Sequence, residues 1–326
     1  MSNLYFIEKL ENYNKILSDN PKKEIWTHLL KNCDVSYLKR QFPELDLEAY
    51  EFISTSINQA HEYYQASKSV SLRTRPLLLY YSILNLTKGV IYIRQEKEPS
   101  GYHGLSNTEL DNNIIDMSAK INNGVYMELS QLLNIKAEKG LRITFSDFCN
   151  NIIELYWDYC NYFDKDVKIV VPKVEVYMGG KIDLTFSKDQ CSDFNMIKEE
   201  TNLLYDFKII NENEILKLTN KEKFNNKKEC VLLMEKYFDF SIYPDKNYYL
   251  NINQQKIPSI LSYFGVLFLL SDIVRYRPNK LYYLLDDKEE SIQWFLKRTC
   301  DISERAFPDL LLNLIYKPKL KYATYN

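Results

Sequence analysis

The chain has 326 residues, of which 45% are apolar and 26% are charged. It can therefore bury a hydrophobic core, and this composition excludes an intrinsically disordered protein. The formal net charge of −2 excludes an overall electrostatic attraction to nucleic acid or to an anionic membrane, so binding to either would need a local basic patch.

The six cysteines are scattered, and no pair has the two-residue gap of a zinc or redox motif. We therefore expect free thiols, no metal site and no cofactor. The first residues of the chain interrupt their apolar character with charges almost at once, which is not typical of a signal peptide. We expect a cytoplasmic protein, because the cytoplasm keeps thiols reduced.

The first half of the chain is predicted to be mainly helical. Its densest apolar run lies within residues 69–106, where Pro76 suits the first turn of a helix that continues over residues 77–93. Ser106 followed by Glu109 is a capping-box pattern for a further short helix. Apolar residues also recur at helical spacing over residues 4–17, 24–32, 34–41, 46–67 and 144–163.

The pattern changes after residue 164, where β-branched and aromatic runs with alternating polarity predict strands. Gly179-Gly180 predicts a hairpin between the second and third of these strands. The predicted strands are residues 167–171, 174–177, 182–186, 203–210 and 231–234.

Helical character returns near Pro258. Residues 257–274 approach the length of a membrane-spanning helix, but Pro258, three serines and Asp272 favour a buried core helix. Two amphipathic helices, at residues 288–300 and 309–315, and a polar tail from residue 317 complete the predicted elements.

These patterns predict an α+β protein that is predominantly α. We expect a helical bundle with a β-rich insertion between its N- and C-terminal helical parts. The expected boundaries are residues 1–164 for the N-terminal helical part, 165–255 for the β-rich insertion, and 256–326 for the C-terminal helices that complete the bundle.

Three polar residues interrupt the central apolar helix. Tyr81, Asn85 and Lys88 lie at positions i, i+4 and i+7 and so share one helix face. An amide and an amine on such a helix are costly unless they find partners. The functional interpretation is a polar pocket inside the bundle, and the structural one is a solvent-facing edge or a hydrogen-bond network.

His103 follows this helix in the sequence Gly101-Tyr102-His103-Gly104. The flanking glycines allow backbone to approach a ligand closely, and a loop histidine can act as an acid, a base or a phosphate contact. The alternative is a turn histidine that hydrogen-bonds its own loop.

Two pairs of charged residues lie at helix ends. Arg73 and Arg75 precede the central helix and could bind an anion at its N-terminus, or they are ordinary surface arginines. Asp272 and Arg275 are spaced to form a pair near the end of the second apolar helix. We find no Walker loop, nucleophile elbow, dinucleotide-binding fingerprint or carboxylate-rich nuclease motif.

The runs SLRTRPLLLYYSILNLTKG and GYHGLS resemble the bacterial YaaC-like protein family. So do GVYMEL, SYFGVLFLLSDIVRYRPNKLYYLL and FPDLLLNLI, which extend the resemblance from about Trp26 to Ile315. The resemblance implies no established activity.

More distantly, a tyrosine-rich helix with a late lysine, followed by a His-Gly-Leu loop, resembles the helical HEPN superfamily. That resemblance implies an HEPN-like bundle, and functions that range from ribonucleases of antiphage systems to nucleotide binding. HEPN ribonucleases place an arginine a few residues before the histidine. Here residues 95–102 separate Arg94 from His103, so the standard HEPN motif is missing.

Two functions from different classes follow. The first is a nucleic-acid- or nucleotide-directed module in antiphage defence, with RNA or a nucleotide as its partner. A metal-independent ribonuclease-like reaction would use His103 as acid–base and Lys88 or an arginine for the phosphorane charge. The catalytic candidates are His103 and Lys88, and the binding candidates are Tyr81, Asn85, Arg73, Arg75 and Arg275.

The alternative is a non-catalytic protein-interaction or scaffold subunit. In that case the same residues brace the bundle, and the β-rich insertion binds a partner protein. Assembly into a homo-oligomer is compatible with either function, and neither involves a membrane.

Overall fold

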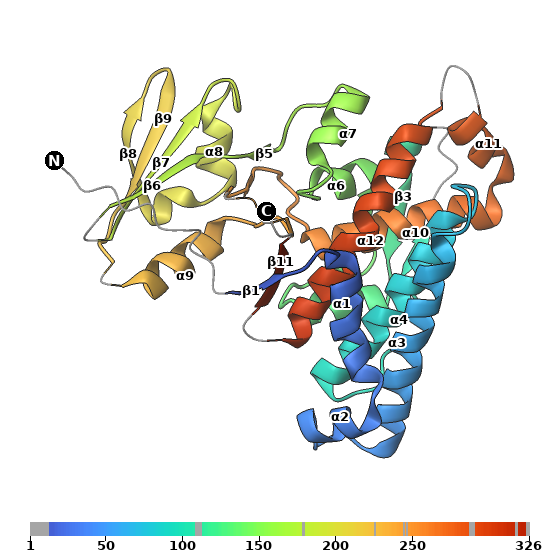
Figure 1. Cartoon of the computed structure of the whole chain (residues 1–326). Helices are drawn as coiled ribbons and strands as arrows, with labels where there is room; N and C mark the ends of the chain where they lie inside the picture. The colour runs from blue at the N-terminus through green and yellow to red at the C-terminus, as the bar shows by residue number, and fades with distance from the viewer. Residues whose placement is uncertain are drawn as a thin grey trace.

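The computed structural model describes residues 13–107, 113–177, 180–224, 226–243, 245, 247–286, 291–316 and 319–323. The protein is α+β and predominantly helical, as the sequence predicts. Figure 1 shows a large helical part and, beside it, a smaller part that contains the principal sheet.

Among the described residues, five helices precede residue 133. They are α1 (Pro21–Leu30), α2 (Val35–Gln41), α3 (Leu47–Ser67), α4 (Arg75–Gln95) and α5 (Val125–Leu132), with the 3-10 turns η1 (Lys31–Cys33) and η2 (Ile114–Asp116). The helices predicted at residues 46–67 and 77–93 are confirmed as α3 and α4. Asp46 caps α3 by accepting a hydrogen bond from Ala49 N, and Pro76 lies in the first turn of α4.

Helices α3 and α4 lie side by side along most of their length (Figure 1). Gly89 permits this close packing, because a Cβ added there would lie 3.0 Å from Ile57 Cγ1. The side chain of Ser82 also crosses the interface and donates to Ala60 O at 2.7 Å. The two helices therefore form one rigid wall of the bundle.

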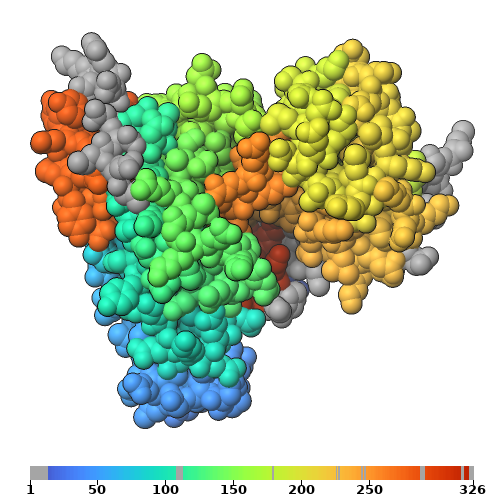
Figure 2. All heavy atoms as spheres, turned by 180° about the vertical axis from the view of Figure 1, so that it is seen from behind, coloured from blue at the N-terminus to red at the C-terminus, as the bar shows by residue number. Residues whose placement is uncertain are grey.

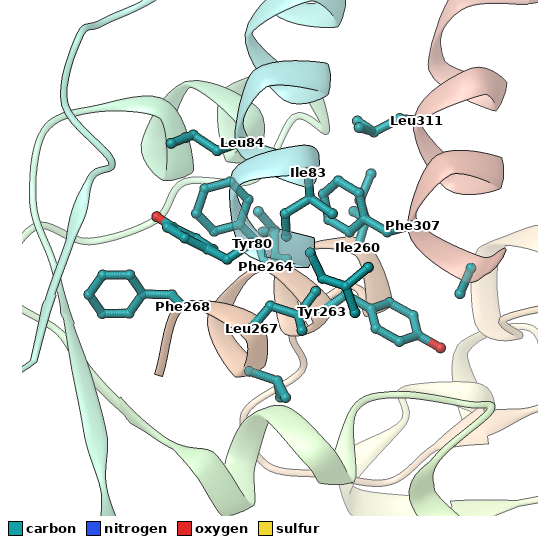
Figure 3. Packing of buried hydrophobic residues seen from close by; sticks show 14 of the residues in the cluster. Tyr80, Ile83, Leu84, Ile260, Tyr263, Phe264, Leu267, Phe268, Phe307 and Leu311 are labelled. Carbon is teal, nitrogen blue, oxygen red and sulfur yellow. The ribbon is translucent and has the colours of Figure 1, made fainter. Parts of the chain in front are cut away.

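Helix α10 (Ser259–Tyr276) is the core of the helical part, since each residue from 260 to 273 is buried. Its Phe264 and Phe268 meet Tyr80 of α4 edge-on, and Phe307 of α12 (Gln293–Ile315) packs on the same cluster (Figure 3). By length and composition α4 and α10 could cross a membrane, but 67% and 78% of their apolar windows are buried inside the protein. Both therefore act as core helices, as predicted for residues 257–274.

The principal sheet is antiparallel, with the strand order β6-β7-β9-β8. Its strands are β6 (Lys173–Tyr177), β7 (Lys181–Ser187), β8 (Phe207–Glu212) and β9 (Ile215–Asn220). Strands β6 and β7 form the predicted hairpin, in which Gly180 has a φ of +72°. Together with α8 (Phe194–Glu200), η3 (Leu203–Tyr205) and α9 (Lys227–Tyr237), this sheet encloses a second hydrophobic core, distinct from that of the helices.

The described residues also form three smaller sheets. They are β1 (Tyr13–Leu17) with β11 (Lys319–Ala323), β2 (Leu105–Asn107) with β3 (Ser118–Ile121) and β4 (Arg142–Thr144), and β5 (Ile169–Val170) with β10 (Leu250–Asn251). The parallel β1–β11 pair corrects two predictions. From Tyr13 onward the helix expected at residues 4–17 is a strand, and the tail expected from residue 317 is a strand with Tyr322 fully buried.

The long helix predicted at residues 144–163 is interrupted, giving α6 (Phe145–Asn150) and α7 (Tyr156–Phe163). The cause is Asn151, which is buried and hydrogen-bonds the segment that leads into α10. Its Oδ1 accepts from Asn251 Nδ2 at 2.7 Å and from Ile257 N at 3.0 Å. Its own carbonyl accepts from Ser259 Oγ instead of continuing a helix. A tertiary network therefore ends α6.

Other local predictions were also wrong. The strand expected at residues 231–234 lies inside α9, whose N-terminus Asn226 caps by accepting from Glu229 N. Two separate helices were expected at residues 288–300 and 309–315. From Gln293 onward they are one continuous helix, α12, with Pro308 buried inside it. It follows α11 (Pro278–Asp286). Ser106 lies in β2, whereas its expected capping partner Glu109 lies outside the described residues.

Candidate functional site

The loop that carries His103 is held by the first turn of α5. Val125 N donates to Tyr102 O, and Tyr126 N donates to His103 O, each at 3.0 Å. The first backbone N–H groups of a helix have no partner within the helix, so these two carbonyls satisfy them. These backbone hydrogen bonds to α5 thus fix the position of His103.

The glycines around this loop serve a contact between two backbone segments. Gly104 has a φ of +83° and Gly124 a φ of +144°. A Cβ on Gly124 would lie 2.5 Å from Gly104 N, whereas one on Gly101 would meet nothing within 4 Å. We predicted that the glycines beside His103 leave room for a ligand. Gly104 instead leaves room for the backbone of Gly124.

The His103 ring is bonded to a tyrosine of the central helix. Tyr80 Oη lies 2.9 Å from His103 Nδ1, and the two ring centroids are 5.6 Å apart. Burial raises the pKa of Tyr80, so its hydroxyl stays protonated. The protonated hydroxyl of Tyr80 can donate to Nδ1, its hydrogen-bond partner. We therefore infer that Nδ1 accepts this bond and that His103 carries its proton on Nε2.

Two cations lie close enough to act on His103. Burial lowers its pKa first, and the charges of Arg275 and then Lys88 lower it further. The imidazole is therefore neutral at pH 7. The guanidinium of Arg275, near the end of α10, lies 5.9 Å from the centroid of the Tyr80 ring. It donates to Ser271 O and Oγ at 3.3 Å and has no carboxylate partner among the described residues.

Lys88 and Asn85 face a shallow cavity of about 420 Å³ between α3 and α4. Burial lowers the pKa of Lys88, and the charge of Glu128 opposes this effect. Asn85 Nδ2 donates to Tyr81 O at 3.0 Å, and the Tyr81 ring stacks on Tyr63 of α3 with centroids 5.5 Å apart. The shared face of Tyr81, Asn85 and Lys88 thus lies along α3. The cavity is lined by Glu48, Glu51, Phe52, Thr55, Ser56, Gln59, Asn85 and Lys88.

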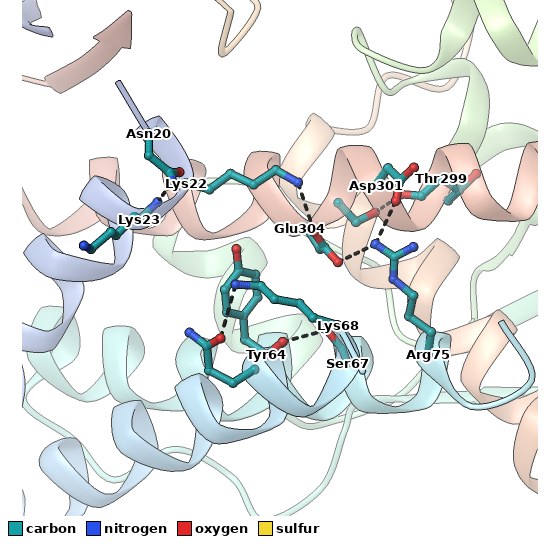
Figure 4. Close-up of polar contacts among 12 residues, drawn as sticks. Asn20, Lys22, Lys23, Tyr64, Ser67, Lys68, Arg75, Thr299, Asp301 and Glu304 are labelled. Atoms are coloured by element: carbon teal, nitrogen blue, oxygen red, sulfur yellow. Dashed lines mark hydrogen bonds and ion pairs between the residues drawn. The ribbon is translucent and has the colours of Figure 1, made fainter. Parts of the chain in front are cut away.

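Arg73 and Arg75 are engaged with carboxylates of the C-terminal helices. Arg73 Nη2 lies 2.7 Å from both carboxylate oxygens of Asp286. Arg75 pairs with Asp301 at 2.7 Å and with Glu304, as Figure 4 shows. Each arginine therefore binds protein carboxylates, where the sequence had suggested a bound anion.

The pair expected between Asp272 and Arg275 is not formed. Asp272 Oδ2 instead accepts from Asn107 Nδ2 at 2.8 Å and lies 3.2 Å from Arg277 Nε. Arg275 points toward the aromatic rings of Tyr80 and Tyr276. Asp272 therefore pairs with Arg277 and not with Arg275, and Arg275 has no carboxylate partner within the described ranges.

Of the predicted site residues, Arg275 and Lys88 are near enough to His103 for their charges to lower its pKa. Asn85, Tyr81 and Lys88 lie on the α3 side of α4, and Arg73 and Arg75 belong to other ion pairs. Tyr80, which contacts both His103 and Arg275, was missed by the sequence analysis. Its only signal is its position beside Tyr81 on the apolar side of the helix.

We expect Tyr80→Phe to lower the free energy of unfolding by about 1–2 kcal/mol, because it leaves His103 Nδ1 without its donor. Chemical denaturation would measure this change. In ¹⁵N NMR spectra, the His103 ring should shift from a single Nε2–H tautomer toward a mixture. Tyr81→Phe is the matched control, since the Tyr81 hydroxyl makes no hydrogen bond within the described part of the chain. Equal effects of both variants would contradict the assigned bond.

Comparison with family models matches residues 24–315 to the model described as YaaC-like Protein. Neither the curated proteins nor the solved structures contain a match to the chain.

Proposed function

The chain belongs to the YaaC-like protein family, and we propose that it binds the phosphate groups of a nucleotide or an RNA. The binding site in this proposal is the cluster of His103, Arg275 and Lys88. The observation that carries it is a neutral histidine that Tyr80 orients, next to Arg275, which has no carboxylate partner among the described residues. Buried or half-buried cations that lack a counter-ion favour an anionic ligand.

The chemistry of this cluster suits a phosphodiester. Tyr80 occupies His103 Nδ1, which leaves Nε2 to face a ligand. A neutral imidazole can donate a hydrogen bond through Nε2–H, or exchange a proton once a phosphate raises its pKa. Arg275 and Lys88 would stabilise the added charge of a phosphorane. RNA cleavage without a metal ion is therefore the catalytic form of this proposal.

We further propose that the helical bundle is HEPN-like and that the protein acts in antiphage defence. The resemblance of the central helix and the His-Gly-Leu loop supports them. The separation of Arg94 from His103 by residues 95–102 argues against the standard HEPN ribonuclease motif. A reaction here would rely on Arg275, which comes from a different helix.

His103→Ala and Arg275→Gln are each expected to weaken the binding of a fluorescent oligoribonucleotide by about ten- to a hundredfold. The physical reason is the loss of a charge-assisted hydrogen bond to phosphate. Fluorescence anisotropy at several salt concentrations would measure the affinity, and a nuclease assay with chelator present would test cleavage. Arg40→Gln, which removes an exposed arginine on α2, is the matched control and should leave binding unchanged.

A non-catalytic scaffold is the second candidate, and one observation favours it. The His103 loop caps α5 and bonds Tyr80, so its contacts also brace the bundle. If the wild-type protein binds neither RNA nor nucleotides and His103→Ala only lowers the melting temperature, the phosphate-binding proposal fails and the scaffold function is favoured.

A further inference from the structure

A second cavity, of about 340 Å³, lies where the helical part meets the β-rich part. Its walls come from α12, the start of α10, strand β11 and the segment that follows α9. Figure 2 shows this face of the molecule, where β11 is visible between the two parts. None of the residues assigned to the phosphate site lines this cavity, so it is a separate feature of the protein.

Three carboxyl groups line this cavity: those of Asp309 on α12, Glu235 on α9 and Asp239 after α9. Asp309 of α12 is only 2% exposed, and its Oδ1 is 3.4 Å from Asn313 Nδ2. Asp239 follows α9 and is exposed. Burial raises the pKa of Asp309 to about 7. Neither Asp239 nor Asp309 forms an ion pair with a described residue, although the charge of Arg305 acts on Asp309 and that of Lys256 acts on Asp239.

The lysines that line the cavity do not cancel these charges at short range. Lys321 is buried and already has a partner of its own, and Lys319 is exposed. Each lysine lowers the pKa of one nearby aspartate, but Glu154 raises the pKa of both. The carboxylate of Glu154 accepts hydrogen bonds from Ser241 Oγ, Ile242 N and Tyr263 Oη, so both of its oxygens have donors.

The remaining surface of the cavity is mostly apolar. It includes Ile153, Phe238, Ile260 and Leu314. A volume of this size accommodates a small organic molecule, and an apolar lining with a few polar groups is typical of such sites. No cluster of three or more potential metal ligands occurs in the part of the chain that the structure describes, so the carboxyls do not form a metal site there.

We propose that this cavity binds a small organic cation with an apolar body, whose ammonium group lies between Asp239 and Asp309. The carboxylates supply the charge that the ligand needs, and the apolar walls bury the rest of it. The ligand would thereby couple α12 of the helical part to the segment after α9 of the β-rich part.

Binding should depend on pH, because only the ionised carboxylate attracts a cation. A raised pKa means that the charged form is populated only as the pH rises through that value. The groups facing Asp309 are Arg305, Glu154 and Lys321. Those near Asp239 are Lys256, Glu154 and Lys319, together with Glu235, which lines the same cavity. Since Asp309 has a pKa of about 7, we expect affinity to rise about tenfold between about pH 6 and pH 8.

The test uses the full chain and two probes of similar shape and opposite charge, 2-phenylethylammonium and 3-phenylpropionate. Isothermal titration calorimetry should detect binding of the ammonium probe and its strengthening with pH, but no binding of the carboxylate. Asp239→Asn and Asp309→Asn should each weaken binding by at least about tenfold. Asp189→Asn, at an exposed turn, is the matched control and should change nothing.

Equal binding of both probes, no binding of the ammonium probe at millimolar concentration, or unchanged binding in Asp239→Asn would each overturn the inference. Asp239→Asn retains this power even if Asp309→Asn fails to fold. His103→Ala should leave ammonium binding intact, so the failure of one site is distinguishable from the failure of the other.

Discussion

Gly124→Ala is expected to lower the free energy of unfolding by about 3–5 kcal/mol. Two causes act together at this position. The φ of +144° is a conformation that residues with a Cβ rarely adopt. The added Cβ would also lie 2.5 Å from Gly104 N and 2.6 Å from Tyr102 O, and both atoms belong to backbone that cannot rotate away. Urea denaturation followed by circular dichroism would measure the loss.

Two other glycines separate the causes. Gly140 has a φ of +93° but open space around it, so Gly140→Ala should cost only the backbone strain of about 1 kcal/mol. Gly101→Ala lies in the same loop as His103 and meets nothing within 4 Å, so it should be nearly neutral. A loss in Gly124→Ala no greater than in Gly140→Ala would show that the loop can shift away from α5.

This contact also matters for the proposed site. Displacing Gly104 from Gly124 would break the hydrogen bonds from Val125 N and Tyr126 N that hold His103. Even a folded Gly124→Ala protein should therefore lose the Tyr80–His103 bond. The glycine that looked like space for a ligand is instead what fixes the histidine.

The long helices of the protein could be predicted because their signals are local. Helices α3, α4 and α10 each combine a sustained apolar period with a cap or a proline at the start. The β6–β7 hairpin likewise follows from alternation and a glycine turn. In each case the residues that determine the element lie within it or next to it.

Elements defined by distant partners were missed. Strand β1 pairs with β11 at the other end of the chain, and Asn151 ends α6 through bonds to residues 251–259. The apolar run at residues 231–234 fits a strand or a helix equally, because a run of this length carries no distinguishing period. Nothing within these segments indicates the tertiary contacts that decide them.

The candidate site shows the same division. His103 and Lys88 could be selected because each is an unusual polar residue in its local context. The hydrogen bond from Tyr80 and the approach of Arg275 could not, since α4, the loop and α10 meet only in the folded chain. Arg75 was assigned to an anion because its carboxylate partners lie more than two hundred residues away.

Glu304→Ala is expected to lower the free energy of unfolding by about 3 kcal/mol. Glu304 is 6% exposed and pairs with Arg75 through one oxygen and with Lys22 Nζ at 3.0 Å through the other (Figure 4). Its removal leaves Arg75, itself only 13% exposed, with Asp301 as its remaining partner. Lys22 can turn toward solvent, so the main cost is the partly uncompensated guanidinium.

Asp286→Ala is the matched control for this effect, because it breaks the exposed pair with Arg73 and should cost no more than about 1 kcal/mol. The double variant Arg75→Met with Glu304→Leu should recover much of the loss, since it removes both buried charges and keeps the volume. Recovery would mean that Arg75 serves the packing of α4 on α12. If Glu304→Ala instead leaves stability unchanged and creates tighter binding of phosphate, the guanidinium of Arg75 is available to an anion, and its assignment to the ligand site is restored.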